Sequence, residues 1–273
     1  MMSMLFVGGG NMASALVGGM MAHGQSAQDI AVVEVNRATA EALAARWDIR
    51  VHDRLPPDLG AAGTVVLAVK PQQMDEVLAS FPPLDPALRI ISIAAGWTTA
   101  RLSAALRGHG NVVRAMPNTP ALVQAGTTAL FAMPGVNAED RAHAQALMRA
   151  VGHVHWLDDE QRMDAVTALS GSGPAYVFYL MEAMLAAATT LGLDETMARA
   201  MVLETVQGAA QLAYVGKEDA ALLRHRVTSP GGTTAAALEV LMQGQWSETL
   251  QRAVQAACRR SETLARPSSG VAS

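Results

Sequence analysis

A glycine-rich turn close to the start of the chain has the residue types that bind a dinucleotide. Residues 6–13 read FVGGGNMA, which is the pattern G-x-G-x-x-A directly after an apolar run. Gly8 allows a tight turn, Gly10 lets a pyrophosphate approach the backbone, and the small Ala13 allows close packing of helix on strand. The N-terminus of the following helix would point its free N–H groups at the phosphates. We therefore predict a dinucleotide cofactor here; the alternative is a turn without a ligand.

The end of the second expected strand bears on which dinucleotide is bound. An acidic side chain there usually bonds the 2′-hydroxyl of NAD, whereas an arginine suits the 2′-phosphate of NADP. The sequence is Glu34-Val35-Asn36-Arg37. If Asn36 and Arg37 hold the strand end, NADPH is favoured, and if the strand ends at Glu34, NADH is favoured. We predict NADPH, with NADH possible; the alternative for Arg37 is a solvated side chain at a helix start.

Two further strand ends would face the same crevice, because ligands of open α/β sheets bind outside the carboxyl ends of the strands. Lys70 and Pro71 follow the apolar segment Thr64–Val69. Lys70 could instead be a solvated residue that merely ends the strand. The segment Ser92–Gly96 ends the next strand with small residues, which leave room for a nicotinamide or simply pack tightly.

A third motif lies in the second half of the chain. Residues 227–234 read VTSPGGTT and lead into the apolar segment Ala235–Met242. At a helix start the backbone N–H groups lack intrahelical acceptors, so this turn is suited to hold a carboxylate. The alternative is an ordinary cap, with Thr233 or Thr234 capping the helix.

The elements that must position the first two motifs alternate strand and helix. This alternation predicts a mostly parallel, doubly wound α/β sheet, that is, a Rossmann domain. The strands lack polar alternation, as expected where helices cover both faces of a sheet. The expected strands are Met4–Val7, Ile30–Val35, Thr64–Val69, Arg89–Ala95, Asn111–Met116, Thr127–Met133 and His153–Leu157. The expected helices are Ala13–Ala22, Ala38–Trp47 and Ala138–Val151.

From Glu160 onward the chain is rich in Ala, Leu and Met and shows no strand pattern. The expected helices are 160–169, 174–191, 194–215, 218–225, 233–243 and 246–265. A sharp break is expected at Gly171–Pro174, because proline cannot continue a preceding helix but suits a helix start. We therefore predict three parts: an NADP-binding domain 1–159, an all-α dimerisation and substrate domain 160–266, and a disordered tail 267–273.

The expected helices of the second half are too apolar for a small bundle. The segments 176–188 and 197–214 are apolar on more than one face, which is typical of buried helices. A domain of about 100 residues cannot easily bury so much apolar surface alone. We predict an obligate dimer through this domain; the alternative is packing against the N-terminal domain of the same chain.

The composition excludes several classes of protein. Hydrophobic residues make up 51% and charged residues 16%, which excludes a disordered chain. The net charge is −4 and basic blocks are absent, which argues against a nucleic-acid partner. Cys258 is the one cysteine, so a disulfide framework is excluded and a reducing cytoplasm is favoured. With no signal peptide and no long uncharged apolar run, we expect a cytoplasmic protein that does not enter membranes.

Five motifs in order resemble the pyrroline-5-carboxylate reductase family, from about residue 4 to residue 265. They read GGGNMA, AVKP, MPNTP, SGSGPAY and TSPGGTT. The resemblance implies reduction of 1-pyrroline-5-carboxylate to L-proline with NAD(P)H, the final step of L-proline biosynthesis. It also implies a Rossmann domain, a helical domain that interlocks two chains, and a homodimer or a dimer-based decamer.

The resemblance also implies roles for individual residues. The expected cofactor contacts are Val7, Gly8, Gly9, Gly10, Asn11, Met12, Asn36, Arg37, Ala68, Val69, Lys70, Pro71, Ala94 and Ala95. The expected substrate contacts are Ser229, Gly232, Thr233 and Thr234. We expect the Thr234 hydroxyl to be catalytic, through a hydrogen bond to the ring nitrogen. One position departs from some members of the family, which have Asn where this chain has Arg226.

Reduction of a cyclic imine fits the remaining residues and needs no metal, because an iminium is already electrophilic. The chain has no H-E-x-x-H and no clustered cysteines, and we interpret His153 and His155, which would share one strand face, as structural. A runner-up is a 3-hydroxyacid-type enzyme or a related imine reductase, but hydroxyacid enzymes use a lysine early in the helical domain, and residues 160–216 contain none. Another alternative is a regulatory protein that binds the cofactor without turnover. Such a protein would be expected to have lost the substrate-binding motif, whereas residues 228–234 keep it.

Overall fold

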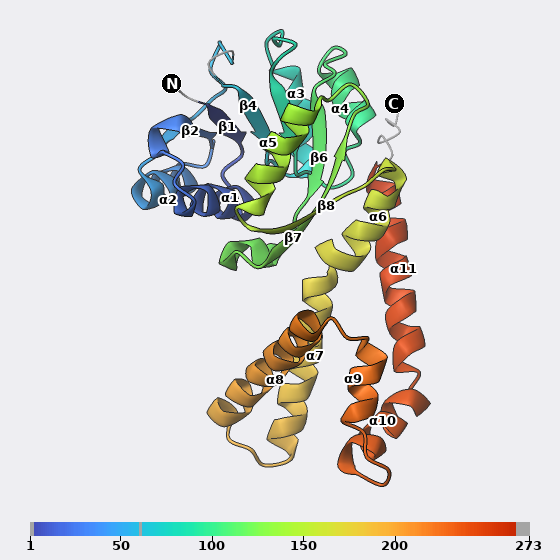
Figure 1. Cartoon of the computed structure of the whole chain (residues 1–273). Helices are drawn as coiled ribbons and strands as arrows, with labels where there is room; N and C mark the ends of the chain where they lie inside the picture. Colours follow the sequence, from blue (N-terminus) through green and yellow to red (C-terminus); the bar gives the residue numbers. More distant parts are fainter. Residues whose placement is uncertain (1–2, 60–61, 266–273) are drawn as a thin grey trace, which may run out of the picture. The chain divides into compact units, whose positions relative to one another are not determined.

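The computed structural model describes residues 3–59 and 62–265 (Figure 1). The predicted disordered tail 267–273 lies outside the described residues. The chain forms two compact units. Unit 1 contains the described residues up to Ser172 and those from Ala257 onward, and unit 2 is Gly173–Ala256.

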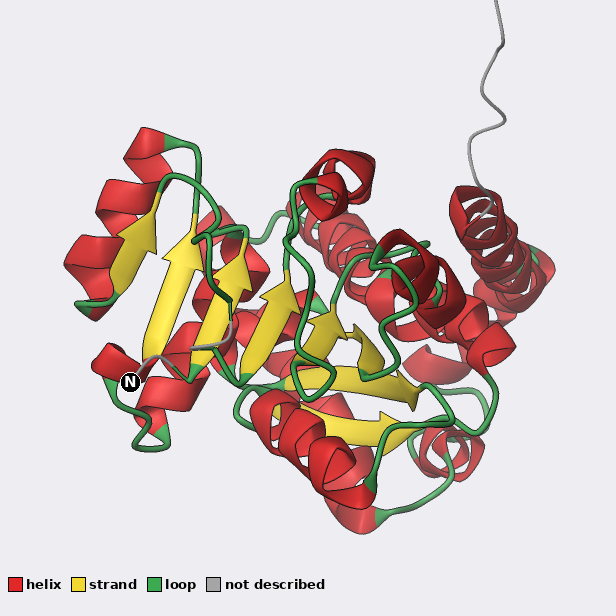
Figure 2. Ribbon diagram, turned by 90° about the horizontal axis from the view of Figure 1, so that it is seen from above, coloured by secondary structure: helices red, strands yellow, loops and turns green. Residues whose placement is uncertain are grey.

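Unit 1 is built on one eight-stranded sheet with the order β3-β2-β1-β4-β5-β6-β7-β8. All neighbouring strands are parallel except β6 and β7, so the predicted mostly parallel, doubly wound sheet is confirmed. Figure 2 shows the strands in one row with helices on both sides. The strands are β1 (Met4–Val7), β2 (Ile30–Val33), β3 (Arg50–His52), β4 (Thr64–Leu67), β5 (Arg89–Ser92), β6 (Val112–Met116), β7 (Gly126–Ala132) and β8 (Gly152–Trp156).

The helices of unit 1 cover both faces of this sheet. On one face Phe6 and its neighbours pack with Leu16 and Leu147, and on the other face Leu5 and its neighbours pack with Leu78 and Leu102. The α-helices are α1 (Asn11–Ala22), α2 (Arg37–Trp47), α3 (Met74–Ala79), α4 (Thr99–Ala105), α5 (Ala138–Arg149) and α6 (Met163–Val166). The 3₁₀ turns are η1 (Ala27–Asp29), η2 (Pro71–Gln73), η3 (Thr119–Val123) and η4 (Glu160–Arg162), and η5 (Thr167–Gly171) is a π-helical turn.

Unit 2 is helical throughout. Its elements are α7 (Gly173–Thr190), α8 (Glu195–Gly216), α9 (Ala220–Arg226), α10 (Thr233–Gln243) and the first part of α11 (Trp246–Ala265). α7 and α8 lie side by side (Figure 1). Among the described residues no strand follows β8, as predicted. Within the same residues, no helix is long and apolar enough to cross a membrane.

Some local bounds differ from the prediction. The second strand was expected to reach Val35, but β2 ends at Val33. The break expected at Gly171–Pro174 lies at Ser172, between the π-helical turn η5 and the start of α7, and the Ser172 N–H donates to the Thr167 carbonyl at 2.8 Å. Pro174 is the second residue of α7, as suits a proline at a helix start.

Candidate active site

The glycine turn 8–10 lies where β1 passes into α1. Gly8 has φ +102°, a conformation that favours glycine, and its N–H donates to the Val33 carbonyl at 2.9 Å. An added Cβ at Gly8 would lie 2.7 Å from the carbonyl oxygen of Ala68. The turn therefore packs directly on the end of β4, and only glycine fits at this position.

The start of α1 fits the phosphates of a dinucleotide. Gly10 is the N-cap, is exposed, and has no atom within 4 Å of the place where a Cβ would stand. Gly10 makes no side-chain cap bond, and the first turn of α1, which includes Asn11 and Met12, contains no acidic residue. The N–H groups of this turn point outward and favour an anion. The open surface and the missing cap are what a pyrophosphate requires, so the residues present fit the predicted cofactor.

The other predicted cofactor segments lie at the same edge of the sheet. The Ala68 N–H donates to the Val7 carbonyl at 2.8 Å, and the Ile93 N–H donates to the Leu67 carbonyl at 3.0 Å. These bonds bring the end of β1 beside Ala68, with Val69, Lys70 and Pro71 following, and bring the end of β4 beside Ile93, with Ala94 and Ala95 following. Because β1 leads to β2 on one side and pairs with β4 on the other, this edge is the topological switch point, where ligands of such sheets bind.

The residues after β2 differ in position from the prediction. Asn36 and Arg37 do not end the strand: Asn36 is the N-cap of α2, and its Oδ1 accepts the Thr39 N–H at 3.0 Å. Arg37 is the first residue of α2, has an exposed side chain, and pairs with Glu41 at 2.7 Å. The strand ends earlier than expected because Asn36 caps α2, and a residue that caps the next helix does not also continue the strand ladder.

Glu34 stands directly after the end of β2, and the sequence alone assigns it no role beyond favouring NADH if the strand ends there. Its Oε2 accepts the Gly9 N–H at 2.8 Å and its Oε1 accepts the Asn36 N–H at 2.7 Å. Glu34 therefore joins the glycine turn to the start of α2. An acid at this strand end was the available signal, but the pairing with Gly9 was not predicted.

Trp97 is a second residue that sequence reasoning missed. It is 1% exposed, and its indole Nε1 donates to the Pro71 carbonyl at 3.0 Å. The guanidinium of Arg101 lies 3.5 Å from the centre of its ring. Trp97 thus ties the segment after β5 to the Lys70–Pro71 segment, and no pattern in the sequence marks that contact.

The predicted substrate motif lies in unit 2, between α9 and α10. Gly232 is the N-cap of α10 without a side-chain cap bond, and its N–H donates to the Ser229 carbonyl at 3.0 Å. Gly231 has φ +71°, the left-handed conformation that this turn requires. Thr233 and Thr234 are the first two residues of α10, and the N–H groups in the first turn of a helix have no intrahelical acceptor. The turn Ser229–Gly232 thus opens the start of α10 to an anion.

The residues before this turn are held by local bonds. The Thr228 hydroxyl donates to the Arg224 carbonyl at 2.6 Å. Arg226, the position that departs from some members of the family, forms an ion pair with Glu218. Its guanidinium is therefore engaged at the start of α9 rather than free for a ligand.

Titratable groups also lie away from these two turns. Burial lowers the pKa of His143, and the nearby Arg89 guanidinium lowers it further, against the opposing effect of Asp140 and Glu139. Its Nε2 lies 2.9 Å from the Thr64 hydroxyl. His153 and His155 are exposed on one face of β8. No three His, Cys, Asp or Glu side chains of the described residues are grouped so that they could hold a metal ion.

Comparison with known families matches both halves of the chain. Residues 160–264 match the family described as "Pyrroline-5-carboxylate reductase dimerisation". Residues 3–96 match the family described as "NADP oxidoreductase coenzyme F420-dependent". The first match covers the helical region, and the second covers the glycine turn and the ends of β4 and β5.

Several named relatives are similar over nearly the whole chain. The pyrroline-5-carboxylate reductase of Pseudomonas aeruginosa is 43% identical over 95% of this chain and 96% of its own length, and that of Haemophilus influenzae is 41% identical over the same shares. A Coxiella burnetii pyrroline-5-carboxylate reductase structure is 38% identical, with a TM-score of 0.88 over 97% of this chain and 99% of that chain. A Plasmodium falciparum pyrroline carboxylate reductase with NADP bound is 27% identical, with a TM-score of 0.87 over 97% and 98%. The chain therefore belongs to the pyrroline-5-carboxylate reductase family of oxidoreductases.

Proposed function

We propose that this protein reduces the C=N bond of 1-pyrroline-5-carboxylate to L-proline, with hydride from NAD(P)H, as the final step of L-proline biosynthesis. The observation that carries the proposal is the 43% identity to the Pseudomonas aeruginosa reductase over 95% of the chain. That span includes both the glycine turn and the turn before α10. The geometry of both turns, each open to an anion, supports the proposal.

We assign the dinucleotide to the edge of the sheet that is formed by the carboxyl ends of the strands. The pyrophosphate lies on the turn formed by Val7, Gly8, Gly9 and Gly10. The N–H groups at Asn11 and Met12 stabilise its negative charge. The segments Ala68–Pro71 and Ala94–Ala95 border the same crevice. A bound nicotinamide supplies the hydride, and the chain orients it, which is where proximity contributes to the rate.

We assign the substrate to the turn before α10. The N–H groups at Thr233 and Thr234, with Ser229, hold the substrate carboxylate against Gly232, whose own N–H donates to the Ser229 carbonyl. The dipole of α10 favours that charge. Thr234 is the catalytic residue that hydrogen-bonds the ring nitrogen. Its hydroxyl relays a proton from water or stabilises the amine that forms when the imine carbon accepts hydride.

We propose NADPH as the preferred cofactor, with NADH also accepted. Arg37 is 91% exposed at its side chain and lies at the start of α2, so its guanidinium is free to turn from Glu41 to a 2′-phosphate. Asn36 adds a neutral side chain beside it. Glu34 stands where an NAD-type acid is expected, but both of its oxygens already accept backbone N–H groups, which reduces its capacity for a ribose hydroxyl.

The chain assembles through its helical region, which matches a dimerisation family. Large apolar side chains of unit 2 are exposed in the single chain, among them Phe178, Met201, Leu212 and Val240 at 53–68%. We propose that they are covered by a second chain in a homodimer, and that dimers assemble into a decamer. The division at residue 160, the cytoplasmic location and the absence of nucleic-acid and membrane partners stay predictions.

The test is to follow NADPH absorbance after adding 1-pyrroline-5-carboxylate and to identify L-proline among the products. NADPH consumption that needs both the protein and the imine, with matching proline formation, is the expected result. A protein that binds NADPH but never oxidises it would instead be a cofactor-binding regulator. Oxidation or reduction that requires a 3-hydroxyacid or its oxo form would favour the hydroxyacid enzymes.

A further inference from the structure

Arg114, in the middle of β6, is a buried cation of unit 1. It is 2% exposed, and its Nη1 donates to Oε1 of Glu160 at 3.2 Å. Its Nη2 is buried without a hydrogen-bond partner among the described residues. A buried charge requires a counter-charge. Glu160, at the start of η4, provides it.

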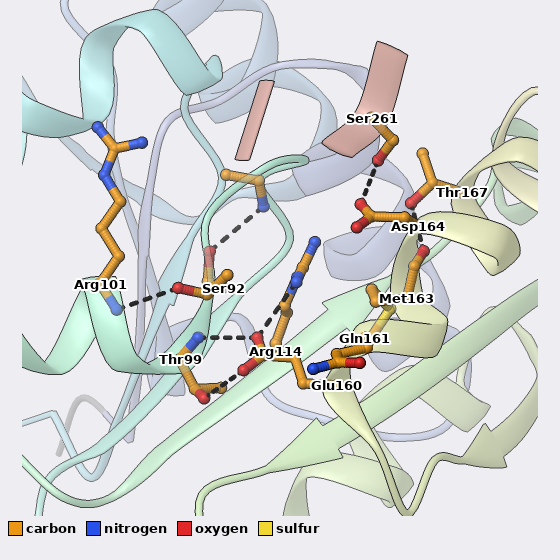
Figure 3. A network of polar contacts seen from close by, with 12 residues as sticks. Ser92, Thr99, Arg101, Arg114, Glu160, Gln161, Met163, Asp164, Thr167 and Ser261 are labelled. Atoms are coloured by element: carbon orange, nitrogen blue, oxygen red, sulfur yellow. Dashed lines mark hydrogen bonds and ion pairs between the residues drawn. The ribbon is translucent and has the colours of Figure 1, made fainter. Parts of the chain in front are cut away.

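Glu160 also holds the first residue of α4. Its Oε1 accepts the Thr99 N–H at 2.8 Å, and its Oε2 accepts the Thr99 hydroxyl at 2.7 Å (Figure 3). Thr99 is 3% exposed, so these bonds are shielded from water. The carboxylate is thus fixed by Arg114 on one side and by Thr99 on the other.

The segment between Ser92 and Thr99 is therefore held at both ends: at Ser92 by the backbone pairing of β5 with β6, and at Thr99 by Glu160, the partner of Arg114. Ser92, the last residue of β5, is the register partner of Arg114, and its hydroxyl accepts the Ala94 N–H at 3.3 Å. At the other end, Thr99 is linked to Arg114 through Glu160. The enclosed segment contains Ala94 and Ala95 of the proposed cofactor site.

The same segment reaches a second part of that site. Trp97 donates to the Pro71 carbonyl, so any displacement of the segment is passed to the residues after β4. Gly96, with φ +75°, lets the chain turn between Ala95 and Trp97. The conformation of both cofactor segments thus depends on one buried network.

We propose that Glu160 and Arg114 are positioning residues for hydride transfer. They fix the segment 93–98 and, through Trp97, the Pro71 carbonyl, and so hold the nicotinamide ring in one orientation. They do not touch the substrate. This inference rests on the proposed function, because it assumes that Ala94 and Ala95 border the nicotinamide.

The test compares Thr99→Val with Thr99→Ser. Valine keeps the volume and the N–H bond to Glu160 but removes the hydroxyl bond, whereas serine keeps the hydroxyl. For Thr99→Val we expect kcat to fall about tenfold, since a misplaced ring loses part of its proximity advantage. The kinetic isotope effect with NADPH deuterated at C4 should rise, because hydride transfer then limits turnover more fully. The Kd for NADPH, measured by fluorescence, should change less than about twofold, because the glycine turn is untouched.

Thr99→Ser should recover most of kcat and the wild-type isotope effect. Ser80→Ala is the control, because that hydroxyl donates to the Val77 carbonyl within the last turn of α3 and lies outside this network, so its kinetics should match wild type. The inference is overturned if Thr99→Val keeps the wild-type kcat and isotope effect. It is also overturned if kcat falls together with the melting temperature and serine restores neither. A wild-type protein that never oxidises NADPH with the imine overturns the proposed function, which separates the two failures.

Discussion

Glu34 accepts the backbone N–H of Gly9 at 2.8 Å, across 25 positions of the chain. The glycine turn that faces the proposed pyrophosphate is therefore braced by an acid from the next strand. A Cβ at Gly9 would lie 2.5 Å from Leu43 and 3.0 Å from the Glu34 carboxylate, so the brace also requires glycine there. The same side chain accepts the Asn36 N–H, which links the turn to α2.

Glu34→Gln should shift the cofactor preference toward NADPH. Glutamine has one acceptor oxygen, so it can satisfy one of the two N–H groups, and the loosened turn should raise the KM for both cofactors. The loss of a negative charge near the adenine ribose offsets this rise for NADPH, whose 2′-phosphate is an anion, and not for NADH. The measurement is the ratio of KM values for NADH and NADPH. A ratio that stays constant would show that Glu34 only braces the turn.

Arg37→Ala tests the proposed 2′-phosphate contact from the opposite side. The guanidinium can bind a phosphate through two parallel hydrogen bonds, and NADH has no such group. We expect the KM for NADPH to rise about tenfold or more while the KM for NADH changes little. Equal changes with both cofactors would remove Arg37 from the cofactor site and leave it as the partner of Glu41. Glu41→Gln is the matched control, since it frees Arg37 without deleting it.

Much of unit 1 could be predicted because its strands are continuous apolar runs. The expected starts of β1, β2, β4 and β5 match the structure, and each run is buried by helices on both faces. The ends were less accurate: the expected β2, β4 and β5 extend two or three residues beyond the last residue of each strand. β3, at Arg50–His52, was not predicted, since its three residues include an exposed arginine and form a strand only by pairing with β2.

The site was predictable only where local sequence determines the geometry. The glycine turn and the start of α10 at Thr233 follow from residue type and spacing, whereas the N-cap is Gly232 and not Thr233 or Thr234. The bonds from Glu34 to Gly9, from Trp97 to Pro71 and from Glu160 to Thr99 join positions 25, 26 and 61 residues apart, and they depend on how the sheet brings the segments together. The roles of Ser229, Gly232, Thr233 and Thr234 toward the substrate stay predictions.

His143 should make the fold less stable as pH falls. The pKa of His143 is lowered in the folded chain, with burial as the largest cause, whereas the unfolded chain titrates near the ordinary value of about 6.5. As pH falls through that value the unfolded state binds the extra proton first, so the free energy of unfolding decreases until the folded histidine is also protonated. This contribution is fully present above the unfolded pKa.

The measurement is the free energy of unfolding by urea at several pH values for wild type and His143→Gln. The variant should lose less stability than wild type between about pH 7 and pH 5. His155→Gln, on the exposed face of β8, controls for the removal of a histidine as such. A variant whose pH dependence equals that of wild type would show that His143 is not the group responsible.

The proposed homodimer should not dissociate on dilution. If a second chain covers the apolar side chains of unit 2, sedimentation at low micromolar concentration should show no monomer. Leu212→Glu places a charge among these side chains, and a charge buried without a partner is costly, so smaller species should appear. Leu122→Glu is the matched control in unit 1, at 54% exposure, and should leave the sedimentation unchanged. A stable, active monomer of the wild type would refute the proposed assembly.

Thr234→Ala should lower kcat while leaving NADPH binding unchanged. Thr234 is the second residue of α10 in unit 2, whereas the glycine turn belongs to unit 1. In the substrate the ring nitrogen is two bonds from the carboxylate carbon, so a hydroxyl on the turn that holds the carboxylate can reach it. That bond matters most as the amine forms, and losing it should cost about 1–3 kcal/mol, roughly tenfold to a hundredfold in rate.

Thr234→Ser separates a chemical role of the hydroxyl from a packing role of the methyl group. Serine restores the hydroxyl at the same atom and should recover much of kcat. If alanine keeps the wild-type kcat and serine does not, the methyl group matters and the hydroxyl does not. The partner of the ring nitrogen would then have to be Ser229 or an ordered water.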